Sequence, residues 1–65
     1  MRFDDIVVTK LKEGVHGRND VFVCLYNNMY GCVVGERPEY HEYAIRLDGL
    51  NDVLFFYEDE LEVVK

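Results

Sequence analysis

Hydrophobic residues along this chain form short runs separated by turn residues, which is the pattern of a small β-protein. The runs are rich in valine, phenylalanine and tyrosine, which favour extended backbone. Glycine, asparagine and aspartate lie between them and favour turns, while Gly31, inside a run, indicates a bulge or a close backbone approach. We predict strands at Asp5–Leu11, Val21–Tyr26, Tyr30–Val34, His41–Leu47, Val53–Tyr57 and Leu61–Val64.

The run Val21–Tyr26 allows two interpretations. It is continuously apolar and too short for a stable isolated helix, so we predict a strand. The alternative is a helix over Asn19–Met29, in which apolar residues recur at helical spacing, but the valine, tyrosine and asparagine content weighs against it. With the type of Val21–Tyr26 left open, the other five segments predict an all-β fold, a small five-stranded barrel that forms a single domain over residues 1–65.

The predicted hairpin between His41–Leu47 and Val53–Tyr57 is the clearest structural signal. Its first strand alternates in period two, which directs Tyr43, Ile45 and Leu47 toward the core. Its second strand is apolar on both faces, as in a central strand. Two registers remain open, because a five-residue loop places Phe55 opposite Ile45 and a four-residue loop places Leu54 there.

Composition and charge narrow the classes of partner. Of 65 residues, 49% are hydrophobic and nine are aromatic, which is enough for one small core. Residues 1–35 carry four acids and four bases, whereas residues 36–65 carry nine acids and three bases and so hold the whole net charge of −6. An acidic half argues against a nucleic-acid partner and suits a basic protein surface, although solubility alone also explains it.

The cysteines and histidines do not form a recognisable site. Cys24 and Cys32 would lie opposite each other across a three-residue loop, but in a reducing compartment we expect two buried free thiols. His16 and His41 are not at zinc-ligand spacing from either cysteine, and there is no calcium-binding loop motif. We therefore expect no metal and no cofactor.

Other functional classes are excluded by missing signals. There is no nucleophile elbow, no phosphate-binding glycine loop and no paired-acid motif, so we do not expect an enzyme. No apolar run is long enough to span a membrane, and the first five residues do not begin a signal peptide. We expect a cytoplasmic protein that does not bind membranes.

Several segments resemble the small SH3-like barrels. The order is an opening strand Asp5-Ile6-Val7-Val8, a long loop, Gly31-Cys32-Val33-Val34, Tyr43-Ala44-Ile45 and a closing Glu60-Leu61-Glu62-Val63-Val64. The chain is most similar to short SH3-like proteins of bacteria, phages and prophages, and the glycine–valine element is also similar to KOW-type ribosomal and transcription-factor barrels. It lacks the tryptophan and the Ala-Leu-Tyr-Asp-Tyr motif of proline-binding SH3 domains, and it is acidic where RNA-binding KOW barrels are basic.

We therefore predict a non-enzymatic protein-interaction module, such as a phage or prophage modulator that binds a basic host protein. Loop tyrosines supply contact area at low entropic cost, and the acidic corner between the last two strands supplies charge. Two alternatives stay open: a KOW-like binder of RNA or of the transcription and translation machinery, and a structural or homo-oligomeric subunit that associates through Val53–Tyr57. The predicted binding residues are Tyr26, Tyr30, Tyr40, Tyr57, Glu58, Asp59, Glu60 and Glu62.

Overall fold

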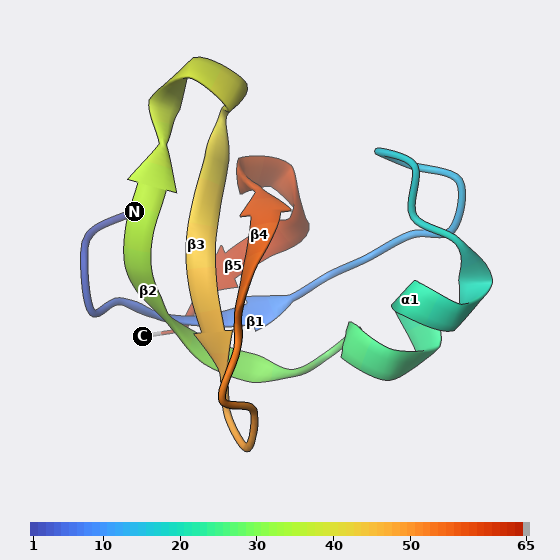
Figure 1. Ribbon diagram of the computed structural model, residues 1–65, viewed down its shortest axis with the longest axis horizontal. Helices are drawn as coiled ribbons and strands as arrows, with labels where there is room; N and C mark the ends of the chain where they lie inside the picture. The colour runs from blue at the N-terminus through green and yellow to red at the C-terminus, as the bar shows by residue number, and fades with distance from the viewer. Residues whose placement is uncertain (65) are drawn as a thin grey trace.

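Five antiparallel strands form one sheet in the order β4-β3-β2-β1-β5 (Figure 1). The structure is a computed structural model and describes residues 1–64. It confirms a small all-β fold with five strands, to which one short helix is added. Within the described residues β4 and β5 are edge strands that do not pair with each other, so the sheet is open. The elements are β1 (Ile6–Thr9), α1 (Asp20–Tyr26), β2 (Tyr30–Arg37), η1 (Pro38–Tyr40), β3 (Glu42–Leu47), β4 (Val53–Tyr57), η2 (Glu58–Glu60) and β5 (Leu61–Val63).

β2 is the strand that joins the two parts of the sheet. Its first residues pair with β1, and most of its length pairs with β3. Figure 1 shows the result: β2, β3 and β4 run side by side, while β1 runs across their direction. A register shift between Val33 and Gly35 marks a β-bulge, which increases the local bend of the strand.

The prediction of a strand at Val21–Tyr26 is wrong, because this segment forms helix α1. The Asn19 side chain caps the helix by accepting a hydrogen bond from the Phe22 N–H at 2.8 Å. Phe22 and Tyr26 lie one turn apart with ring centroids 4.7 Å from each other, and both pack against the core. Tertiary packing of these two rings therefore outweighs the weak helix propensity of the segment.

The helix also changes the predicted placement of the cysteines. Cys24 lies exposed on α1, whereas Cys32 lies half-buried in β2. Both thiols are free. They are therefore not the opposed pair that a hairpin would create, and Cys24 is not the buried thiol that we expected.

The structure resolves the register of the β3–β4 hairpin. Ile45 lies opposite Leu54, which is the register of the shorter loop. Ile45 and Leu47 are buried and Tyr43 is half-buried, so the predicted alternation is confirmed. Ala44, on the opposite face, is buried as well, since Phe55 lies across from it on β4.

The core lies on the face of the sheet that receives Val7 from β1 and Phe56 from β4. A buried polar residue, Thr9, lies at its margin and has no exposed surface. Its hydroxyl donates to the carbonyl of Tyr26 and accepts from the Met29 N–H at 3.0 Å, which fastens the end of α1 to β1. The core cluster is Val7, Leu11, Val33, Ile45, Leu47, Phe56 and Leu61.

A buried ion pair joins the β1–α1 loop to η2. The Arg18 Nη2 and Nε atoms lie 2.7 and 2.9 Å from the two carboxylate oxygens of Glu60. The side chains are 14% and 3% exposed, respectively, so Glu60 is not part of a solvated acidic corner. The hydrogen bond to Glu60 raises the pKa of Arg18 above its ordinary value, which keeps the guanidinium charged.

Gly31 and Gly35 differ in the space that a side chain would find. A Cβ atom on Gly31 would lie 2.7 Å from the backbone oxygen of Arg46, which confirms a close backbone approach. A Cβ atom on Gly35 would meet only the Ala44 methyl group, at 3.5 Å.

We expect Gly31→Ala to lower the free energy of unfolding by about 2 kcal/mol and Gly35→Ala to change it by less than about 0.5 kcal/mol. Urea unfolding of both variants tests this, and equal stability of the two would contradict it.

The buried ion pair provides a second test. Glu60→Gln leaves the half-buried Arg18 guanidinium without its counter-charge, and we expect it to destabilise the fold by about 2–3 kcal/mol. For a domain of this size the melting temperature should fall by on the order of 10–20 °C. Glu62→Gln, two residues away and exposed, is the matched control and should melt within about 2 °C of the native chain. Similar melting temperatures for the two variants would show that the pair does not stabilise the fold.

Candidate functional site

The loops at one end of the sheet enclose a groove of about 440 Å³. The β1–α1 loop forms one wall, the segment after η1 forms the other, and the end of β4 with η2 lies between them. We call it the His16–Tyr57 groove. It is lined by His16, Tyr40, His41, Tyr57, Glu58 and Asp59.

The β1–α1 loop presents His16 to the groove. Gly14 donates its N–H to the Arg18 carbonyl at 2.7 Å, and Arg18 donates its N–H to the Val15 carbonyl at 3.0 Å. These two hydrogen bonds close a tight turn in which His16 has a left-handed φ of 54°. The ion pair between Arg18 and Glu60 then holds this turn against η2, so the buried pair positions His16 as well.

The His16 ring lies flat against Tyr57 and points at Asp59. The two ring centroids are 4.0 Å apart, with an angle of 20° between the ring planes. The His16 Nε2 atom lies 2.9 and 3.0 Å from the two carboxylate oxygens of Asp59. The contact combines a stacked aromatic pair with a hydrogen bond, which fixes the orientation of the imidazole.

The opposite wall is formed by the turn that follows β2. Pro38 begins the 3-10 helix η1, and His41 ends it with a left-handed φ of 57°. The His41 carbonyl accepts a hydrogen bond from the Glu58 N–H at 3.1 Å, which joins this wall to the base of the groove. Tyr40 is 59% exposed, so its ring is accessible to a partner.

Four of the eight predicted binding residues meet in this groove, namely Tyr40, Tyr57, Glu58 and Asp59. Glu60 lies directly beside them in the chain but is buried in the ion pair with Arg18. The other three lie elsewhere: Tyr26 is half-buried on α1, Tyr30 begins β2, and Glu62 lies opposite Val8 on β5.

Sequence reasoning missed both histidines of the groove. It weighed His16 and His41 only as zinc ligands and found no matching spacing. The usable signal was the context of His16, since Gly14 and Gly17 on either side both have positive φ and form a compact, outward-facing turn. His41 had no comparable signal, because its position depends on a left-handed residue at the end of η1.

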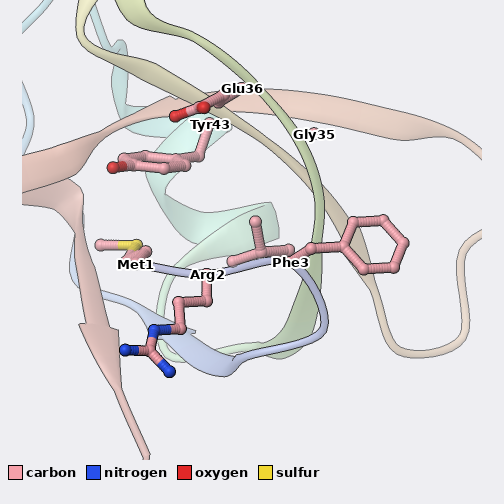
Figure 2. Close-up of a pocket in the computed structure, with 7 residues that line it drawn as sticks. Met1, Arg2, Phe3, Gly35, Glu36 and Tyr43 are labelled. Carbon is pink, nitrogen blue, oxygen red and sulfur yellow. The ribbon is translucent and has the colours of Figure 1, made fainter.

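A second hollow, of about 400 Å³, lies beside the N-terminal segment (Figure 2). Figure 2 shows the Tyr43 ring and the Glu36 side chain on one side, with Met1 near them and the Arg2 and Phe3 side chains directed away from that pair. Burial, together with the nearby carboxylates of Glu58 and Glu36, raises the pKa of Tyr43. None of the predicted binding residues lines this hollow, which is lined by Arg2, Glu36 and Tyr43 among others.

Among residues 1–64, no group of three or more histidine, cysteine, aspartate or glutamate side chains is arranged to hold a metal ion. In the same part of the chain, no helix has the length and apolar character needed to cross a membrane.

Comparison with known protein families, curated proteins and solved structures finds no match to the chain.

The chemical character of the groove follows from these contacts. Its surface is largely apolar ring, provided by Tyr40, Tyr57 and the two histidines, with the carboxylates of Glu58 and Asp59 at its edge. Arg18, on the loop that forms one wall, is already paired with Glu60. Ring faces beside carboxylates favour a positively charged group that also has apolar parts, such as an arginine or lysine side chain.

Proposed function

We propose that this chain is a non-enzymatic protein-interaction module and that a partner with a basic surface binds in the His16–Tyr57 groove. The observation that carries the proposal is the convergence of Tyr40, Tyr57, Glu58 and Asp59 from two separate loops. Apolar contact with the rings would supply most of the binding energy, and the carboxylates would select a cation.

Charge distribution supports the same occupant. All of the net charge of −6 lies in residues 36–65, and the groove takes five of its six lining residues from that half. The groove itself contains two carboxylates, those of Glu58 and Asp59. An anionic partner would be repelled there, whereas a basic one would be attracted on approach.

The wider biological part of the proposal rests on the sequence resemblance alone. On that basis we propose that the open sheet belongs to the SH3-like barrels and that the protein acts in the cytoplasm as a phage or prophage modulator of a basic host protein. Of the alternatives, RNA binding is opposed by the sign of the charge. Association through β4 is opposed by Arg18 and Glu60, which bond the outer edge of that strand at Phe55 and Tyr57.

Binding of a labelled, short arginine-rich peptide tests the proposal. We expect the double variant Glu58→Gln/Asp59→Asn to bind about tenfold more weakly at physiological salt, because it removes both carboxylates from the groove. Fluorescence anisotropy measures the affinity. NMR chemical-shift changes in the native chain should centre on His16, Tyr40 and Tyr57.

The matched control is Asp48→Asn/Asp52→Asn, which removes the same charge at the β3–β4 turn, at the other end of the sheet (Figure 1). It should bind within about twofold of the native chain, since charges beyond a Debye length of about 8 Å are screened. Equal losses in both double variants would mean non-specific attraction. Tighter binding of an RNA homopolymer, or concentration-dependent dimers in sedimentation, would favour the two alternatives.

A further inference from the structure

The contact between His16 and Asp59 places a titratable ring directly on one of the two groove carboxylates. Nε2 faces both carboxylate oxygens, at 2.9 and 3.0 Å, and the ring cannot turn away without losing its stack on Tyr57. We propose that His16 is a proton-controlled gate of the groove: protonated, it neutralises Asp59 and weakens the binding of a basic partner. This inference rests on the proposed function and specifies its regulation.

Charge counting at the site gives the direction of the effect. With His16 neutral, Glu58 and Asp59 give the groove a charge of −2; protonation of His16 reduces it to −1. A charged imidazole also donates a stronger hydrogen bond to Asp59 than a neutral one does. A cationic side chain of the partner and the proton on His16 therefore compete for the same carboxylate, so each weakens the binding of the other.

The groups around His16 leave Asp59 as its main electrostatic partner. Arg18, on the same loop, is paired with Glu60. Lys10 and Lys12 line a separate hollow on the other side of Asp59. The remaining titratable groups that face the groove are Tyr40, His41, Tyr57 and Glu58.

The working range follows from histidine chemistry. Histidine is the residue type that ordinarily changes charge between pH 5 and 8. The affinity for a basic peptide should therefore fall as the pH decreases from about 7.5 to about 5.5. One screened charge contributes about 1 kcal/mol, so the expected loss is about fivefold.

The experiment measures binding of the arginine-rich peptide by calorimetry at both pH values, in two buffers with different ionisation enthalpies. The native chain should lose about fivefold in affinity at the lower pH and should release protons on binding. His16→Gln retains a hydrogen-bond donor but does not titrate, so its affinity should change by less than about twofold. His41→Gln is the matched control and should keep most of the pH dependence of the native chain.

The possible outcomes distinguish pH control by His16 from the proposed binding of a basic partner. Circular dichroism first establishes that each variant is folded. Peptide binding that is independent of pH, or tighter at pH 5.5, overturns the gate and leaves the proposed function standing. A pH dependence that survives His16→Gln also overturns it, whether or not His41→Gln removes that dependence. Absence of peptide binding at every pH overturns both.

Discussion

The ion pair between Arg18 and Glu60 is the contact on which the rest of the structure depends. Arg18, on the long β1–α1 loop, bonds both Glu60 of η2 and the Phe55 carbonyl of β4, so this pair connects all three segments. The guanidinium also lies over the Phe22 ring, 4.5 Å from its centroid, so α1 is held against the same group. Without this pair, the loop that carries His16 would have few contacts of its own to fix it beside Tyr57.

The same pair protects an edge of the sheet. Successive residues of a strand alternate in the direction of their backbone groups, and on β4 the Phe55 carbonyl and the Tyr57 N–H point away from β3. Arg18 donates to the first of these at 3.2 Å, and Glu60 accepts from the second at 2.9 Å. An open sheet of apolar strands is prone to pairing with other chains, and here side chains occupy two of the backbone groups that an incoming strand would use.

Sequence reasoning found the strands because their signal is local. Alternation along Tyr43–Leu47 and the Asp48-Gly49 turn identify the hairpin, while its register depends on a loop length that local pattern leaves open. Helix α1 was missed because the run Val21–Tyr26 is apolar on both sides, and only the packing of Phe22 and Tyr26 against distant strands selects the helix. Only half of the predicted binding residues lie in the groove, again because a long-range contact decides the outcome. Glu60 cannot be distinguished from Glu58 and Asp59 by its local sequence, and its partner Arg18 lies 42 positions away.

The pairing of β1 with β5 has a consequence for the order in which the molecule forms. Strands β2, β3 and β4 follow one another with short connections, so their contacts close small loops. β1 and β5 pair across almost the whole chain, as when Val64 donates its N–H to the Ile6 carbonyl at 2.8 Å, and closing so long a loop costs more chain entropy. We expect the three-stranded meander to assemble early and the β1–β5 seam late, so substitutions in the seam should speed unfolding more than they slow folding in a chevron measurement. The His16–Tyr57 groove, which needs the loop after β1 and the turn before β5, would then be completed only in the last step of folding.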